Sequence, residues 1–194
     1  MWQRLEGEKV VLEPLLPEHE EPMATAARFP AVWKLVDHPG HEPEGFAAWF
    51  ARAREEAAAE REAPFATVDA QSGEVIGSTR FMRLHPEHRG LEIGWTWLTP
   101  AAWRTGANVE AKLLMLEHAF EHLECARVQL KTDARNERSR RAMSALPAQF
   151  EGIHRKHRLL TDGSFRDSAF FSVVDDEWPE VRANLEERLS KKLG

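Results

Sequence analysis

The stretch LEIGWTWLTPAAWRTGANVEAKLLMLEHAF, residues 91–120, decides the fold. Its first part, LEIGWTWL, alternates between apolar and polar positions, which is typical of a β-strand. After Pro100 the apolar positions recur with the period of an α-helix, so a helix is expected over about residues 106–123. A strand that leads directly into a helix indicates a protein of mixed α/β architecture.

The same periodicities extend over the rest of the chain. Strands are expected at residues 9–15, 64–70, 74–84, 91–98, 126–133, 147–160 and 164–174, and helices at 17–36, 42–63, 106–123, 136–146 and 177–193. This order predicts an α/β fold with a mixed, mostly antiparallel sheet of about seven strands flanked by helices. It does not suit a doubly wound dinucleotide fold, because no strand leads into the glycine pattern of such a site. We expect one domain over residues 1–194, a usual domain size.

Composition narrows the class of function. The chain has no signal-peptide pattern and no apolar run long enough to span a bilayer, so a cytoplasmic protein without membrane contact is expected. A net charge of -6 argues against nucleic-acid binding. The single cysteine, Cys125, lies in a helical apolar pattern and is expected to be buried. Four arginines gather in residues 133–141, as a solvated helix face or as an anion site.

The start of the helix after Pro100 is a candidate anion site. The first N–H groups of a helix lack partners within it, and the helix dipole places partial positive charge at the same end. Gly106 would let a phosphate approach the backbone closely, and Arg104 and Lys112 would add positive charge. A glycine at a helix start is also common without any ligand.

Larger patterns carry a family resemblance. The stretch 91–120, followed by RVQLKTDARNERSRRAM and later by FEGIHRKH and FRDSAFFSV, resembles the GNAT N-acetyltransferases, and within them the RimJ/RimL-type ribosomal-protein N-terminal acetyltransferases. The resemblance covers residues 5–178 and is strongest over 92–139. It implies that acetyl-CoA lies between the strand ending near Leu98 and the strand 126–133. Its pyrophosphate would then lie on the backbone of Arg104, Thr105, Gly106, Ala107 and Asn108.

The sequence departs from the general pattern of that family at three places. In the loop Q/R-x-x-G-x-G/A, Trp103 and Asn108 occupy the first and last positions and only Gly106 is kept, although Trp103 and Glu110 match the RimL-type group. Pro147 stands where relatives commonly have Leu-Gly, so that turn must be built differently. Many members protonate the departing thiolate with a tyrosine, and this chain has none.

The resemblance suggests roles for several polar groups. Strict alternation would divide the strand 91–98 into two faces: Glu92, Gly94 and Thr96 on one, and Ile93, Trp95 and Trp97 on the other. Glu92 is the candidate base, through a water molecule, or it is a solvated strand-end glutamate. Backbone N–H groups near Trp97 and Leu98 would stabilise the oxyanion. Asn136 and Ser139 match the family's N-x-x-S pattern beside the cofactor arm, or form a plain helix cap, and Ser139 or water would protonate the thiolate.

The leading hypothesis is therefore an acetyl-CoA-dependent N-acetyltransferase. A peptide N-terminal α-amine is the preferred acceptor, with small amines such as polyamines or aminoglycosides as alternatives. The alternative class is an inactive CoA-binding or sensor module on the same fold. No metal site is expected, because His118 and His122 lack the glutamate of the H-E-x-x-H pattern. The acceptor wall is expected around Trp33, Asp37 and Trp49, and the sequence leaves a homodimer open.

Overall fold

One mixed sheet organises the molecule. The computed structural model describes residues 2–34, 36 and 38–193. The sheet has eight strands in the order β1-β2-β3-β4-β5-β6-β8-β7, and all neighbours are antiparallel except β5 and β6. The strands are β1 (Leu5–Glu6), β2 (Val10–Pro14), β3 (Ala63–Asp69), β4 (Val75–His85), β5 (Gly90–Leu98), β6 (Arg127–Asp133), β7 (Gln149–Leu159) and β8 (Phe165–Val174). The α/β class and the mostly antiparallel sheet are thus confirmed, with one short strand, β1, that the sequence patterns missed.

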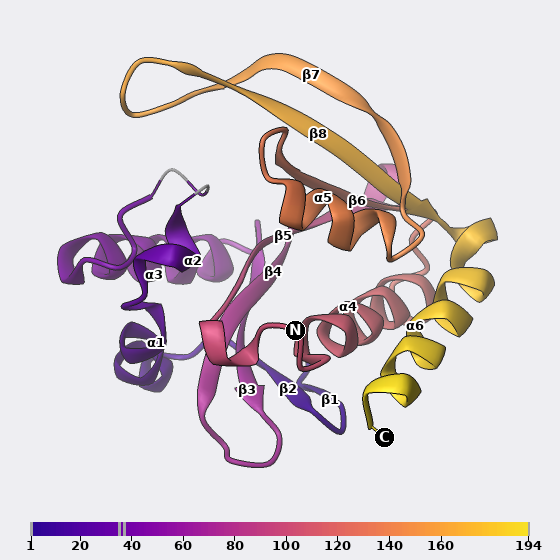
Figure 1. Cartoon of the computed structure of the whole chain (residues 1–194), viewed down its shortest axis with the longest axis horizontal. Helices are drawn as coiled ribbons and strands as arrows, with labels where there is room; N and C mark the ends of the chain where they lie inside the picture. Colours follow the sequence, from indigo (N-terminus) through magenta and orange to yellow (C-terminus); the bar gives the residue numbers. More distant parts are fainter. Residues whose placement is uncertain (1, 35, 37, 194) are drawn as a thin grey trace.

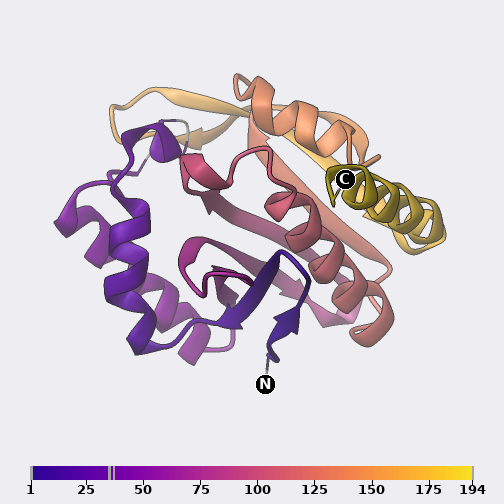
Figure 2. The ribbon, with the colours of Figure 1, turned by 60° about the horizontal axis from the view of Figure 1, so that its bottom comes forward.

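Helices cover the two faces of the sheet (Figures 1 and 2). They are α1 (Glu20–Ala27), α2 (Pro30–Trp33), α3 (Pro43–Ala58), α4 (Ala107–Glu117), α5 (Glu137–Ser144) and α6 (Trp178–Leu193). Helices α1 to α3 form one hydrophobic core with β2, β3 and Trp97, whereas α4 and α6 form the other core with the opposite face. Cys125 is buried in the α4 core, as expected. Among the described residues, no helix is long and apolar enough to cross a membrane.

Two helices differ from the expected lengths for local reasons. The helix expected at residues 17–36 breaks because Pro30 holds Phe29 in an extended conformation, which separates α1 from α2. The helix expected at 106–123 is α-helical only to Glu117 and continues as a turn of π-helix, His118–His122. Both boundaries are set by short-range backbone geometry that the apolar period does not reveal.

Strands β5 and β6 separate at the centre of the sheet. They pair in parallel from Gly90 with Arg127 to Ile93 with Leu130, and not beyond. From there β5 stays paired with β4 as far as Leu98, and β6 stays paired with β8 as far as Asp133. The ends of two neighbouring strands therefore diverge, and this splay positions the candidate site.

A β-bulge lies in the diverging part of β5. The register with β4 shifts between Ser78 and Arg80, and Trp95 has a φ of 48°. The extra residue reverses the alternation beyond Gly94. Trp97 therefore packs in the core of α1 to α3, whereas Thr96 bonds to Lys112 of α4. The prediction that Thr96 shares a face with Glu92 and Gly94 was wrong for this reason.

Candidate functional site

A cavity of about 910 Å³ opens at the splay of β5 and β6. Its wall comes from both diverging strands, the loop before α4, α4 itself and α5. It includes most of the residues singled out in the sequence: Glu92, Trp97, Leu98, Arg104, Asn108, Asn136 and Ser139. Residues from three separate stretches of the chain are thus brought to one cavity. Its volume is in the range of small-molecule and cofactor sites.

The loop before α4 reaches the cavity wall at Arg104. Arg104 and Gly106 both have left-handed backbone conformations, with φ of 68° and 103°. The carbonyl of Gly106 accepts the first hydrogen bonds of α4, from the N–H groups of Val109 and Glu110. The earlier N–H groups therefore lack partners within the helix. Left-handed residues in a turn produce concavities that bind anions.

Three of the predicted cofactor residues, Thr105, Gly106 and Ala107, complete the turn without lining the cavity. The Thr105 hydroxyl donates to the carbonyl of Ala102 at 2.9 Å and accepts from the Ala107 N–H at 3.3 Å. These bonds fix the loop, and Ala107 itself is buried in the α4 core. These contacts fix the shape of the loop, whereas Arg104 and Asn108 on either side of it line the cavity.

Glu110, in the first turn of α4, is a structural clamp. Its carboxylate accepts three backbone hydrogen bonds, from Glu8, Lys9 and Val10, at 2.7 to 3.0 Å. Because carboxylate bonds to backbone N–H groups are strong, Glu110 ties the β1–β2 turn to the start of α4. The match of Glu110 to the RimL-type pattern therefore has a structural basis.

Asn136 and Ser139 form a helix cap beside the cavity. The Asn136 side-chain oxygen accepts from the Ser139 N–H at 3.1 Å, at the start of α5. Both residues also line the cavity, so the cap and a binding role are compatible. The turn after α5 has no left-handed residue, since the ring of Pro147 holds a negative φ, and it is closed by the N–H groups of Leu146 and Ala148, which both donate to the carbonyl of Met143.

Glu92 is buried and bonded on all sides. Its carboxylate lies 2.9 Å from the Lys131 ammonium and 3.2 Å from the Arg83 guanidinium, and it accepts a hydrogen bond from Gln129 at 2.9 Å. Only 2% of its surface is exposed, so it is not a solvated strand-end residue. Burial lowers the pKa of Lys131, and the Glu92 carboxylate opposes that shift.

Lys112 lies on the α4 side of the same splay. The sequence predicted that Lys112 would add positive charge at the phosphate site, because the apolar period of the helix does not fix the direction of this side chain. Instead its ammonium donates to the hydroxyls of Thr96 at 2.8 Å and Thr79 at 3.3 Å. Burial lowers its pKa to about 7.

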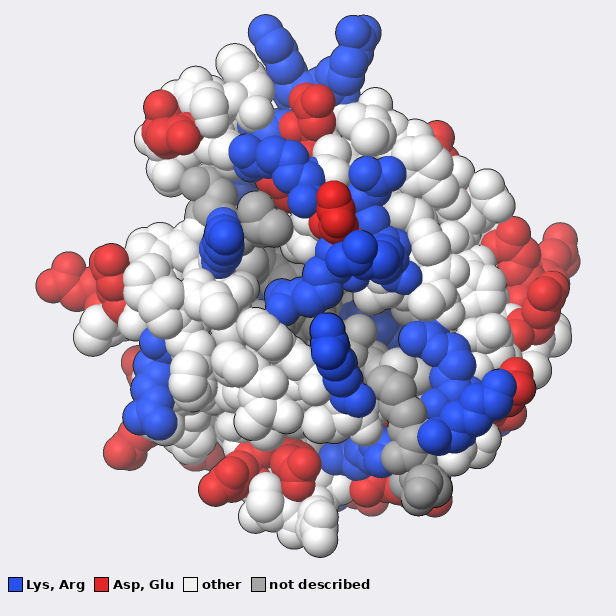
Figure 3. Space-filling model, viewed as in Figure 1, with Lys and Arg blue, Asp and Glu red and all other residues white. Residues whose placement is uncertain are grey.

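The charge of the cavity wall is opposite in sign to that of the whole chain. The described lining residues include seven Lys and Arg side chains and two carboxylates: Arg104, Lys112, Lys131, Arg138, Arg141, Arg158 and Arg166, against Glu92 and Asp133. Figure 3 shows Lys and Arg gathered across the centre of this face, with most acidic side chains nearer its rim. The cavity is therefore suited to an anionic ligand despite the net charge of -6.

The arginines of α5 divide into two groups. Arg138 and Arg141 line the cavity, and the Arg138 guanidinium lies 4.2 Å from the centre of the Trp103 ring. Arg140 instead donates to the carbonyl of Ala134 and lies over the Phe150 ring. Sequence spacing alone could not separate these residues, because their direction depends on how α5 packs.

Two of the residues expected to form the acceptor wall do not line the cavity. Trp33 and Trp49 are buried in the core of α1 to α3 and do not line the cavity. Asp37 lies outside the described residues. On this side the cavity is lined by Val36, Met82 and Trp95, together with Arg158 and Arg166 from the β7–β8 hairpin. The hairpin residues could not be assigned from sequence, because they reach the site only through the curvature of the sheet.

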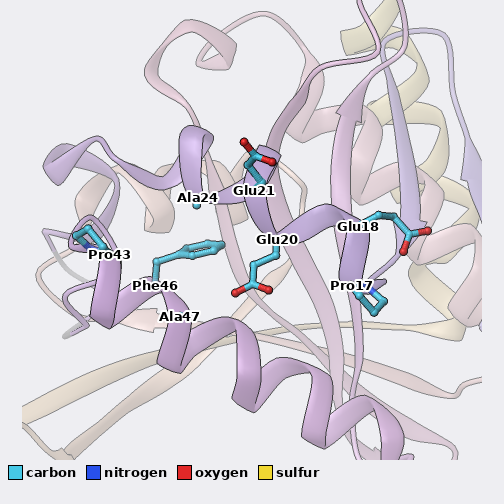
Figure 4. Close-up of a pocket in the computed structure, with 8 residues that line it drawn as sticks. All are labelled: Pro17, Glu18, Glu20, Glu21, Ala24, Pro43, Phe46 and Ala47. Carbon is cyan, nitrogen blue, oxygen red and sulfur yellow. The ribbon is translucent and has the colours of Figure 1, made fainter.

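A second, smaller hollow lies between α1 and α3 (Figure 4). Its volume is about 460 Å³, and its wall includes Glu18, Glu20, Glu21 and Phe46. It shares no lining residue with the larger cavity and offers three carboxylates without a cationic group. An anionic cofactor would be repelled there, so the larger cavity is the candidate active site.

Comparison with known proteins identifies relatives of this architecture. Residues 9–148 match the model of an acetyltransferase (GNAT) domain. Two curated relatives are the uncharacterized N-acetyltransferases YoaA of Bacillus subtilis, 30% identical over 52% of this chain, and p20 of Bacillus licheniformis, 27% identical over 59%. The matched parts span 56% and 63% of those two proteins.

Solved structures extend the likeness over nearly the whole chain. A protein of T. thermophilus described as an acetyltransferase is 40% identical over 97% of this chain and 100% of its own, with a TM-score of 0.84. A GCN5-related N-acetyltransferase from Brucella melitensis is 29% identical over 95% of this chain and 84% of its own, with a TM-score of 0.87. The overall fold is thus shared with these proteins.

Proposed function

Because the chain belongs to the GNAT acetyltransferase family, we propose that it transfers the acetyl group of acetyl-CoA to a primary amine. The observation that carries this proposal is the cavity at the splay of β5 and β6, whose wall includes Arg104 and Asn108 from the turn at the start of α4. A cavity lined both by this turn and by the separated strands suits a long cofactor with a reactive end.

The cofactor would be held mainly by backbone and by cations. We propose that the pyrophosphate lies on the turn from Arg104 to Asn108, since Gly106 has no side chain to block a phosphate and the α4 dipole favours negative charge. Asn136 of α5 would contact the pantetheine arm. The fold is shared with Mycobacterium smegmatis RimJ, which was solved in complex with CoA-disulfide and is 21% identical.

The chemistry requires a neutral amine and an open path to the thioester. In the proposed reaction the amine attacks the thioester carbonyl, and backbone N–H groups near Trp97 and Leu98 stabilise the oxyanion. Glu92 would accept the amine proton through water, a role supported by its position in the cavity wall. Ser139 would contact the departing sulfur.

An N-terminal α-amine is the proposed acceptor. Its reference pKa is about 8, against about 10.4 for a lysine side chain, so far more of it is neutral near pH 7. The candidate base, Glu92, already bonds to three donors, which suits an acceptor needing little activation. A protein of similar fold from Vibrio cholerae, 17% identical, is described as a ribosomal-protein-serine acetyltransferase.

The alternative is a CoA-binding module without turnover, and the absence of tyrosine from the sequence favours it. Labelled acetyl-CoA and an amine panel separate the two. The panel should contain a peptide with a free N-terminus, an N-terminally blocked lysine peptide, a polyamine and an aminoglycoside. The proposal expects transfer to the free N-terminus above all. CoA binding without transfer to any of them would favour the alternative.

A further inference from the structure

Lys112 is a buried cation beside the candidate active site whose role the proposed function leaves open. Its side chain comes from the second turn of α4 and lines the cavity. Its ammonium bonds to the Thr96 hydroxyl at 2.8 Å and to the Thr79 hydroxyl at 3.3 Å. Thr96 belongs to the β5 bulge, at the point where β5 has left β6. The lysine therefore contacts the segment of strand that borders the splay.

No charge balances Lys112 among the described residues. The groups that face it from β4 and β5 are neutral hydroxyls, and burial is the only cause of its lowered pKa. On α4, the Glu110 carboxylate is bonded to the β1–β2 backbone. On β4, the Arg80 guanidinium pairs with Glu62 and lies over Trp49 and Trp95, in the core of the other face.

Burying an unpaired ammonium is costly, and a purely structural position would favour an apolar side chain. With a pKa of about 7, Lys112 exists in both protonation states at neutral pH. A group whose pKa is close to the working pH can give a proton to a reacting group beside it or take one from it. The unfavourable burial of the Lys112 ammonium is therefore consistent with a chemical role for this residue.

The two threonines give the proton a path. Thr79 and Thr96 share a hydrogen bond of 2.8 Å, and Lys112 donates to both. With Thr96 accepting from Thr79 and Lys112, its own O–H is left to donate. The Thr96 side chain is exposed and lines the cavity.

We propose that Lys112 is the proton source for the departing CoA thiolate and that the Thr96 hydroxyl delivers the proton. This inference rests on the proposed acetyl transfer. As the carbon–sulfur bond of the tetrahedral intermediate breaks, its electron pair goes to sulfur. Thr96 gives its proton to sulfur and takes one from the Lys112 ammonium, which becomes a neutral amine. The nitrogen of the attacking amine loses its proton through water to Glu92, as in the proposed function, and Glu92 passes it to solvent. Lys112 regains a proton from solvent, so the charges balance.

The test compares Lys112→Met and Thr96→Val with the parent. Methionine keeps the length of the lysine stem, and valine keeps the shape of threonine, so each removes one link of the path. The readouts are CoA affinity by calorimetry and kcat for acetyl transfer between pH 5.5 and 9. Lys191→Met, in the exposed last turns of α6, is the matched control.

The parent should show a kcat that falls as pH rises through the region of 7, because the protonated lysine is the active form. Lys112→Met should bind CoA like the parent, lose about 10²-fold in kcat and lose the descending limb. Thr96→Val should lower kcat similarly, and it keeps the test valid if Lys112→Met does not fold. Lys191→Met should match the parent throughout.

Two failures are distinguishable. If the parent binds no CoA or transfers no acetyl group, the proposed function is overturned and this inference with it. If the parent is active and Lys112→Met or Thr96→Val keeps its kcat and pH profile, only the proton path is overturned.

Discussion

The Glu92 carboxylate and the Lys131 ammonium form a buried ion pair, 2.9 Å apart, between the two strands that separate at the cavity. On the α4 side of the same splay, Lys112 is buried with two hydroxyls and no carboxylate. The site thus places one neutralised lysine and one unneutralised lysine around the point where the sheet opens. This difference favours an electrostatic role for Lys131 and a role in proton exchange for Lys112.

Gly106→Val should abolish CoA binding, because a side chain at the left-handed turn would occupy the approach to the backbone and strain it. CoA at about 100 times its Kd should raise the Tm of the parent by about 5–10 °C and leave that of the variant unchanged. Gly73→Val is the matched control, since Gly73 is also left-handed, with a φ of 73°, but lies in the β3–β4 turn. Equal CoA-induced shifts for parent and Gly106→Val would remove this turn from the cofactor site.

Arg138→Ala and Arg141→Ala should weaken CoA about tenfold and dephospho-CoA less, if either arginine contacts the adenosine 3′-phosphate. Both line the cavity, whereas Arg140 is bonded to the carbonyl of Ala134. Arg140→Ala therefore serves as the control. Calorimetric titration of each variant with both ligands gives the comparison, and identical ratios for all three would indicate a solvated face.

Glu110→Ala should lower the free energy of unfolding by about 3 kcal/mol or more, because three backbone N–H groups lose their acceptor. Glu117→Ala, further along α4 and paired with Arg182 at 3.9 Å near the surface, should change it by less than about 1 kcal/mol. Urea denaturation measures both. If both variants changed the free energy of unfolding by similarly small amounts, the β1–β2 turn would hold its place without the hydrogen bonds to Glu110.

The sequence predicted the order of elements well, because long segments with a clear period of two or 3.6 depend on local chemistry. It also located the start of α4 at Gly106 and the cap at Asn136. It could not predict the bulge at Trp95, because an inserted residue changes which side chains share a face of the strand but does not disturb the alternating pattern of LEIGWTWL in the sequence. The wrong prediction for the face of Thr96 follows from this bulge. The wrong predictions for Trp33 and Trp49 follow from the packing of α1 to α3, which brings together segments that are far apart in the sequence. Nor could it reveal that Lys112 lacks a carboxylate, which depends on three elements meeting in space.

Lys112→Met should stabilise the protein, and the gain should shrink as pH rises. The pKa of Lys112 is about 7 in the folded state against 10.5 for the ordinary side chain. Between these values the unfolded chain holds a proton that the folded chain has released, so the stability of the parent rises with pH across this window. Below pH 7 the parent has the full free-energy cost of burying the charged lysine. The stability advantage of Lys112→Met over the parent should therefore fall by about 2–3 kcal/mol between pH 6 and 9.

Urea denaturation of both proteins at several pH values measures that difference. Lys191→Met again serves as the control, because its exposed ammonium should give no such trend. A constant difference between the Lys112→Met protein and the parent would mean that Lys112 stays charged in the folded state, which contradicts the proton exchange proposed for it.

Glu92→Gln should lower kcat/KM most at low pH. With a peptide α-amine as acceptor, the amine is mainly protonated below its pKa of about 8, and a base that removes the proton matters most there. As pH rises past that value, the neutral amine reacts without help and the defect should shrink. The substitution also takes a charge partner from Lys131 and Arg83, which would lower stability or acceptor binding at every pH.

Gln129→Leu separates these effects, because it removes one hydrogen bond from the same carboxylate and leaves the carboxylate itself in place. We expect Gln129→Leu to lose some stability without a pH-dependent loss of kcat/KM. A defect of Glu92→Gln that is equal at all pH values would assign Glu92 to positioning Lys131 and Arg83. No defect at any pH, with an acceptor whose turnover is established, would leave water as the only proton acceptor, since the amine proton would then reach solvent without passing through the carboxylate.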